Sequence, residues 1–215
     1  MSTSSTATPV AGDGLASSLV AGVVLGTTIE RHTDSVVGDL VDRLSPSMST
    51  TDVMVATHWI PVGDRQRSCL SVQLPSGDVA LAWRTLLAAL PSGVDTALAC
   101  CLGERHTGPD DLWDAAGAAA HAHAVRSSGR AVHFPGASSL VGTMSVREML
   151  VASSIDQVRV LAAGEADPDM LVITRDHVRP LWSRGQLVLF TQPAAGETLV
   201  PFESPNPTPC CAAHG

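Results

Sequence analysis

The sequence contains no lysine and no tyrosine, and only 3% of its 215 residues are aromatic. Its core must therefore consist mainly of Val, Leu and Ala. All 13 basic residues are arginine, and 21 acidic residues give a formal net charge of −8. This balance argues against a general nucleic-acid binder, which needs a basic face to neutralise phosphates. Apolar residues make up 45% of the chain and charged residues 16%, which favours a folded protein over a disordered one.

Signals for secretion or membrane insertion are also missing. Residues 1–14 are mostly small and polar, without the basic start of a signal peptide. The most apolar stretch, residues 19–29, is shorter than the roughly 20 residues that a spanning helix needs. The five cysteines include two adjacent pairs, at 100–101 and 210–211, and such a set does not read as a disulfide framework. We therefore expect a cytoplasmic protein that does not contact a membrane.

No short motif with a known mechanism occurs in the chain. The phosphate-binding, dinucleotide-binding, nucleophile-elbow, zinc-protease and CxxC patterns are all absent from the sequence. The sequence thus names no reaction, and whether the protein is an enzyme stays open at this point.

Apolar runs alternate with amphipathic segments over residues 20–161. Strands are expected at 20–25, 52–62, 68–74, 95–102, 131–134 and 157–161, and helices at 36–44, 79–90, 109–125 and 144–153. Asp34 or Ser35 is expected to cap the first helix. The alternation predicts an α/β fold with a mixed, largely parallel sheet and flanking helices.

The composition divides the chain into four segments. We expect a flexible arm at 1–14, an α/β domain at 15–163, an antiparallel β appendage at 164–203 and a Pro-rich tail at 204–215. The appendage is predicted from apolar strand runs separated by glycine, and the tail from its repeated prolines.

Two stretches of the predicted domain resemble each other. Each has an apolar strand, then Leu-Gly, then Glu-Arg-His-Thr, then an acidic helix start, and each is followed by a His in a later strand that ends near a proline. These stretches suggest an internal β-α-β repeat over 20–62 and 96–135. A chance match of two solvated loops is the alternative.

If the repeat is real, both Glu-Arg-His-Thr segments follow the carboxyl ends of strands, where open α/β sheets bind ligands. The side chains gathered there would be Glu30, Arg31, His32, Glu104, Arg105 and His106. The imidazoles and carboxylates could hold zinc or another divalent metal. The two arginines, Arg31 and Arg105, could instead bind an anion.

Further candidate metal ligands lie in the tail, where Cys210, Cys211 and His214 combine two thiols with an imidazole. The other histidines suggest structural roles. His121 and His123 point about 200° apart on the predicted helix and cannot share one ion. His58 and His133 lie in apolar strands, where a hydrogen-bonded core histidine is the simpler interpretation.

Three functions follow from these features. The leading hypothesis is a non-catalytic interaction or assembly protein with a protein partner or a second copy of itself. The second is a metal- or anion-binding protein, with or without enzymatic activity, that uses the paired Glu-Arg-His-Thr loops. The third is a thiol or metal carrier or sensor that works through the C-terminal tail.

Overall fold

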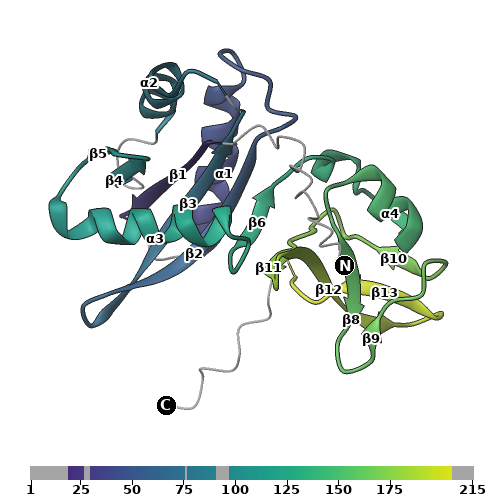
Figure 1. The fold of residues 1–215 in the computed structure, drawn as a ribbon. Helices are drawn as coiled ribbons and strands as arrows, with labels where there is room; N and C mark the ends of the chain where they lie inside the picture. The colour runs from purple at the N-terminus through teal and green to yellow at the C-terminus, as the bar shows by residue number, and fades with distance from the viewer. Residues whose placement is uncertain (1–18, 27–29, 76, 91–96, 205–215) are drawn as a thin grey trace, which may run out of the picture.

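The computed structural model describes residues 19–26, 30–75, 77–90 and 97–204, which form two lobes (Figure 1). The first lobe contains β1 (Leu19–Leu25), α1 (Glu30–Leu44), β2 (Met54–Val62), β3 (Arg65–Leu74), α2 (Val79–Ala89), β4 (Ala97–Leu102), β5 (Arg105–Thr107) and α3 (Trp113–Ala124), the last preceded by a short 3-10 turn, Asp110–Leu112. The predicted arm, and the predicted tail from residue 205 onward, lie outside the described residues.

The sheet of the first lobe has the order β5-β4-β1-β3-β2, and every neighbouring pair in it is antiparallel. The prediction of a largely parallel sheet is therefore wrong. The β2–β3 hairpin explains the difference, because it inserts β3 between β1 and β2. The two strands that flank α1 thus never pair with each other, although strands and helices alternate along the chain. This split β-α-β arrangement accounts for the sequence pattern without parallel neighbours.

The helices cover both faces of this sheet. Helices α1 and α2 pack with Val23, Leu25 and Leu70 on one face, and α3 packs with Val24 on the other (Figure 1). Successive strand residues alternate between these two cores, as the pleat of a strand requires. Cys100 and Cys101 follow the same rule, with one side chain in each core.

Helix α3 lies very close to the sheet. Its sequence, WDAAGAAAHAHA, is dominated by alanine, so its buried side is almost flat. A Cβ atom at Gly22 of β1 would overlap the backbone carbonyl of Ala116. The helix can therefore approach only because both surfaces carry minimal side chains.

The helix boundaries differ in how well the sequence indicated them. Helix α2 begins after Asp78, whose carboxylate accepts a hydrogen bond from the Ala80 amide at 2.8 Å, close to the start expected at 79. Helix α1 begins at Glu30, so the prediction that Asp34 or Ser35 caps it is wrong. The acidic and polar residues before the apolar stripe belong to the first helical turns, and helix boundaries are the part of a helix that sequence patterns place least well.

The second lobe contains β6 (Arg130–His133), β7 (Thr143–Ser145), α4 (Val146–Ala152), β8 (Gln157–Val160), β9 (Gly164–Glu165), β10 (Leu171–Ile173), β11 (Leu181–Ser183), β12 (Gln186–Ala194) and β13 (Thr198–Pro201), with a 3-10 turn, Ala137–Ser139, before β7. One apolar core joins residues on both sides of the expected boundary at 164, including Met149, Val158, Leu187 and Leu199. Within the described residues, β8–β12 and β10–β13 are the parallel strand pairs.

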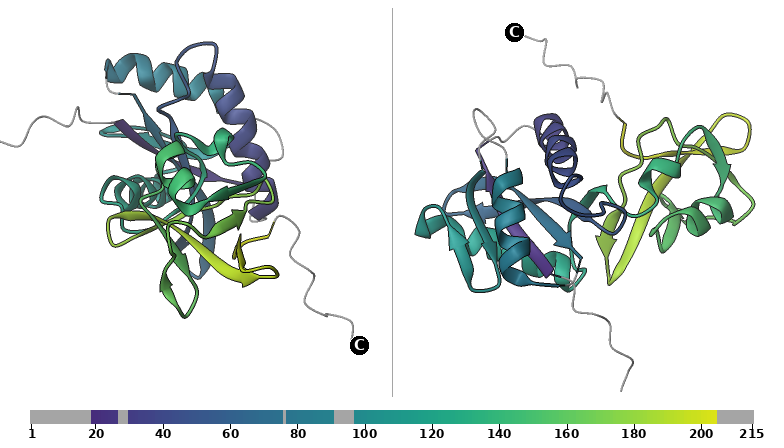
Figure 2. Two further views of the ribbon diagram at one scale, coloured as in Figure 1. Left: turned by 90° about the vertical axis from the view of Figure 1, so that its right-hand side faces the viewer. Right: turned by 90° about the horizontal axis from the view of Figure 1, so that it is seen from above.

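Strand β6 connects the lobes, which lie side by side in the right-hand view of Figure 2. It pairs antiparallel with β2 of the first lobe and contacts β11 of the second through the pair Arg130–Leu181. One continuous sheet path therefore runs through both lobes. Among the helices of the described segments, none is long and apolar enough to cross a bilayer.

Candidate functional site

The two Glu-Arg-His-Thr segments are not brought together by the fold. Strands β1 and β4 run antiparallel, with Leu25 beside Ala97 and Leu102 beside Ala21. The segments that follow these strands therefore leave opposite ends of the strand pair. One forms the first turn of helix α1, while the other forms the β4–β5 turn and strand β5.

The second of these segments is exposed on an edge strand. Glu104, Arg105 and His106 are all solvent-exposed, and the His106 ring contacts Trp113 in a tilted arrangement with 3.7 Å between ring centroids. The backbone of Glu30, Arg31 and His32 lies in α1, and their side chains are outside the description. A metal or anion site shared by the two segments stays an untested prediction.

The tail ligands Cys210, Cys211 and His214 lie outside the described residues. Within residues 19–204, apart from the gaps in the description, no three His, Cys, Asp or Glu side chains are grouped so that they could hold a metal ion.

A hydrogen-bonded chain of two histidines and a serine lies between the first-lobe sheet and α3. His58 of β2 bonds through Nε2 to the Ser71 hydroxyl at 2.8 Å, and that hydroxyl bonds to Nδ1 of His123 at 2.7 Å. The hydroxyl donates to one ring and accepts from the other, so the tautomers of the two histidines are linked. All three side chains are buried. Gly129 packs against the His58 ring, and a Cβ atom there would overlap it.

Burial holds this histidine–serine chain in its neutral form. It lowers the pKa of His58 to about 4. Burial, followed by the charges of His58 and Arg126, likewise lowers the pKa of His123 to about 4. A serine between two imidazoles has the groups needed for nucleophilic chemistry, but these groups are closed to solvent and to any substrate. The chain is suited to fixing the packing of α3 on the sheet.

His123 also faces the second lobe. Its ring lies 6.0 Å from the Trp182 ring of β11, and the Arg126 guanidinium lies 5.0 Å from the centre of that same Trp ring. In the described part of the chain, His123 Nε2 and Trp182 Nε1 are both buried without a hydrogen-bond partner. The histidine–serine chain thus ends at the junction of the two lobes.

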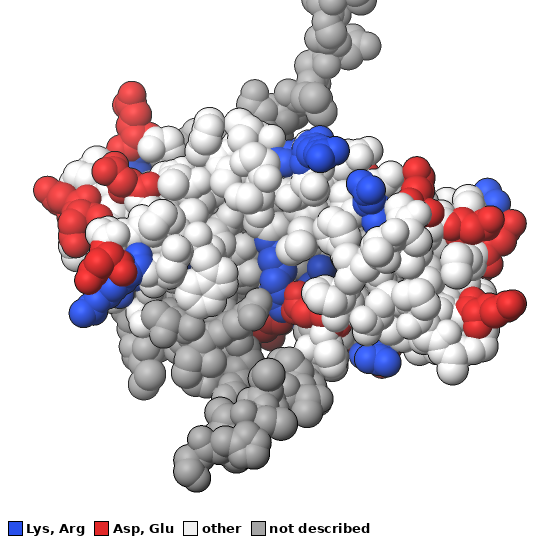
Figure 3. Space-filling view, turned by 90° about the horizontal axis from the view of Figure 1, so that it is seen from below, with Lys and Arg blue, Asp and Glu red and all other residues white. Residues whose placement is uncertain are grey.

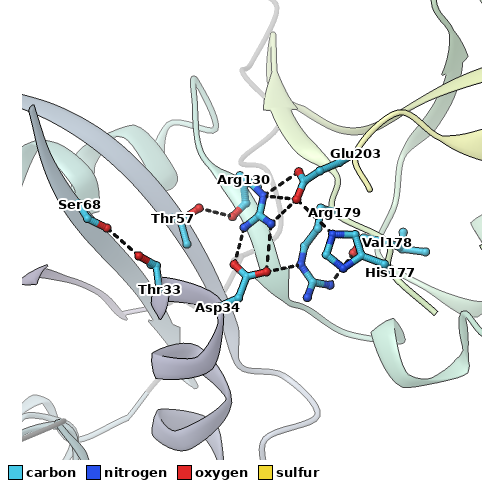
Figure 4. Close-up of polar contacts among 9 residues, drawn as sticks. All are labelled: Thr33, Asp34, Thr57, Ser68, Arg130, His177, Val178, Arg179 and Glu203. Carbon is cyan, nitrogen blue, oxygen red and sulfur yellow. Dashed lines mark hydrogen bonds and ion pairs between the residues drawn. The ribbon is translucent and has the colours of Figure 1, made fainter. Parts of the chain in front are cut away.

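A second polar group, the inter-lobe cluster, consists of Asp34, Arg130, His177, Arg179 and Glu203 (Figure 4). Arg130 of β6 donates Nη1 to Asp34 of α1 at 2.6 Å and Nε to Glu203 at 2.7 Å. Arg179 donates Nε to the same Asp34 at 3.2 Å, and His177 Nε2 lies 3.2 Å from Glu203. Seen from below, acidic and basic side chains lie together in the depression between the lobes (Figure 3).

The charges in the inter-lobe cluster stabilise one another. Burial raises the pKa of Asp34, but hydrogen bonds and charges from Arg130 and Arg179 outweigh it and hold that pKa below its usual value. Burial also raises the pKa of Glu203, and Arg130 and His177 outweigh it in the same way. Burial lowers the pKa of Arg130, yet its two carboxylate partners raise it overall. The cluster therefore remains an ion network that ties α1 and β6 to the end of the second lobe.

Neither the histidine–serine chain nor the inter-lobe cluster is indicated by a sequence pattern. Asp34 and Arg130 are 96 residues apart, and no local spacing links them. A hydrogen-bonded core position was expected for His58 and a structural role for His123, and both side chains are buried. Their common partner, Ser71, stands in an ordinary apolar strand and carries no distinguishing pattern.

Comparisons with known proteins identify no relative of this chain. No protein-family model, no curated protein and no solved structure matches this chain.

Proposed function

We propose that this chain is a non-catalytic assembly protein that associates with a second copy of itself through the outer face of helix α2. Two observations support the absence of catalysis in this proposal. The histidine–serine chain is buried, and the charged side chains of the inter-lobe cluster are paired with one another. The interaction surface itself is the feature that carries the proposal.

Helix α2 is apolar around almost its whole circumference. Its sequence, VALAWRTLLAA, has one charged residue in 11. One side packs in the core through Ala82 and Leu86, while Leu81 on the other side is 55% exposed. Helices that are apolar all round are normally covered on all sides. Val79 and Leu87 of the same helix are also exposed, and exposed apolar surface of this kind marks contact sites.

The charges beside this surface favour a second copy as the partner. Asp78 and Arg84 are both exposed and lie three residues before and three residues after Leu81. If two α2 helices pack antiparallel about a two-fold axis at Leu81, each Asp78 meets the other copy's Arg84. The same patch is then complementary to itself, as a two-fold interface requires. Arg84 forms no ion pair within the described chain.

The size of the surface predicts a reversible association. An 11-residue helix is about 16 Å long, which offers less than the roughly 800 Å² per partner of a standard interface. The free thiols of Cys69, Cys100 and Cys101 fit the reducing, cytoplasmic location that we propose for this assembly.

Sedimentation velocity over a dilution series tests the proposal. We expect the average mass to rise from monomer toward dimer between low and high micromolar protein. Leu81→Glu should hold the protein monomeric throughout, because it places two carboxylates at the two-fold axis. Val151→Glu is the matched control, since Val151 of α4 is 85% exposed but lies in the other lobe. A wild-type monomer at every concentration, or a Leu81→Glu variant that still dimerises, would contradict the proposal.

A further inference from the structure

The second lobe contains a groove that none of the features above explains. It has a volume of about 610 Å³ and is lined by Arg159, Ser183, Arg184, Phe190 and the turn at 161–164. This volume lies in the usual range for small-molecule sites, about 300–1,000 Å³. The groove lies in the second lobe, whereas helix α2 belongs to the first, so it is independent of the proposed dimer surface.

The register of the sheet places the groove's main side chains on one face. Arg159 of β8 lies directly beside Phe190 of β12, and such neighbours project to the same side of a sheet. The residues before them, Val158 and Leu189, belong to the core and face the opposite way. The guanidinium of Arg159 and the ring of Phe190 are therefore presented together on the outward face.

The second guanidinium comes from the tight turn between β11 and β12. Ser183 and Gln186 pair across this hairpin, with Arg184 and Gly185 as its two central residues, both at positive φ. Glycine or asparagine is the usual choice at the first of these positions, because a larger side chain is strained there. This hairpin nevertheless has arginine there, at the rim of the groove.

The two arginines are not neutralised from within the described chain. Neither Arg159 nor Arg184 forms an ion pair or a side-chain hydrogen bond among the described residues, in a protein whose net charge is −8. Glu165 is the cross-strand neighbour of Arg159, but it forms no ion pair with it and does not line the groove. Two free guanidiniums beside a hydroxyl form a suitable donor set for a carboxylate or phosphate.

We propose that this groove binds a small organic anion. Arg159 and Arg184 hold its carboxylate or phosphate group, with Ser183 as an additional donor. The half-buried ring of Phe190 and the side chain of Leu161 contact its apolar part. The two arginines provide the charge recognition, and the apolar floor distinguishes an organic anion from a bare ion.

Amide NMR shifts of the full-length protein test this assignment, with phenyl phosphate and benzoate as probes. We expect saturable shifts at Gly164, Ser183 and Phe190, and the tighter of the two probes identifies the preferred anionic group. Arg159→Ala combined with Arg184→Ala should weaken binding about tenfold or more. Arg175→Ala is the matched control, because Arg175 is an exposed arginine of the same lobe outside the groove, and it should bind like wild type. Glu165→Gln should strengthen binding, because it removes a nearby negative charge.

Three results would overturn the assignment. One is the absence of saturable shifts with either probe. Another is equal binding of neutral benzyl alcohol, which would mean that the arginines do not recognise charge. The third is equal binding of inorganic phosphate, which would mean that the apolar floor adds nothing. Both arginines are exposed, and unchanged circular dichroism of the double variant would confirm that it is folded. None of these results depends on whether α2 mediates dimerisation.

Discussion

The close packing of helix α3 on the first-lobe sheet depends on the absence of a side chain at Gly22. The alanine-rich face of α3 meets β1 where Gly22 has no side chain, and one methyl group there would overlap the carbonyl of Ala116. In the sequence, Gly22 is only a glycine within an apolar strand, a position that weakens a strand on propensity alone. Its necessity becomes visible only when the packing partner, 94 positions later by residue number, is known. The sequence shows a glycine at this position, but it does not show the contact with α3 that makes glycine necessary there.

Gly22→Ala should lower the free energy of unfolding by about 3 kcal/mol or more, because the backbones of β1 and α3 must move apart. Gly38→Ala is the matched control. A Cβ atom at Gly38, on the exposed side of α1, meets nothing within 4 Å. That change should stabilise the protein by about 0.5–1 kcal/mol. Urea unfolding of both variants measures the difference, and equal effects would contradict the close approach of α3.

At the scale of elements, local patterns identified helices and strands more reliably than their partners. The helix expected at 79–90 is α2, because a capping residue and a run of helix-forming residues are local signals. The sheet order was not predicted, because nothing local shows that the strand after β2 lies between β1 and β2. Strand order depends on contacts between distant segments, and alternation along the chain does not determine it.

The histidine–serine chain joins three elements and makes their packing sensitive to acid. His58 and His123 have pKa values of about 4 in the folded protein, against 6.5 as the ordinary value. Between these values the unfolded chain binds protons that the folded protein does not, so stability falls as the pH decreases from 6.5 toward 4. Each histidine should account for roughly 2–3 kcal/mol of this loss.

His123→Asn should reduce the loss of unfolding free energy between pH 7 and about pH 4.5 by about 2 kcal/mol. The Asn amide can still hydrogen-bond to Ser71 but does not titrate. His121→Asn, at an exposed position of the same helix, is the control and should keep the wild-type pH dependence. Urea titrations at a series of pH values measure the slopes. An unchanged slope in His123→Asn would show that this histidine is not buried in its neutral form.

At the scale of the whole molecule, charges hold the two lobes together. The side chain of Arg130 is 10% exposed and bridges the carboxylates of Asp34 and Glu203, which belong to opposite lobes. Nothing in the sequence marks this contact, because its members are scattered between residues 34 and 203 and each is an ordinary charged residue in its own segment. The lobe arrangement is therefore the part of the fold least accessible to sequence reasoning.

Arg130→Met should destabilise the protein by about 2–4 kcal/mol, because it leaves two partly buried carboxylates without their main partner. Arg147→Met is the matched control. Arg147 also pairs with an aspartate, Asp169, but these side chains are 63% and 82% exposed. Exposed pairs contribute about 0–1 kcal/mol, so the control should change little. Equal unfolding free energies for the two variants in urea would mean that the inter-lobe cluster does not couple the lobes.

Self-association through α2 is the central proposal at this scale, and a charge-reversal experiment tests it most directly. Arg84→Asp and Asp78→Arg each place like charges opposite each other across a two-fold contact. Asp78→Arg also removes a helix cap worth about 1 kcal/mol, so circular dichroism must confirm that α2 persists. In a mixture of the two variants, however, every position 78 meets an opposite charge at position 84.

Sedimentation velocity of the two variants, alone and mixed, is therefore the decisive measurement. A two-fold contact centred on Leu81 predicts that each variant alone is monomeric at concentrations where wild type dimerises, and that the equimolar mixture dimerises again. If the mixture stays monomeric while wild type dimerises, the helices do not pair in this register. If each variant alone dimerises as well as wild type, α2 is not the contact surface.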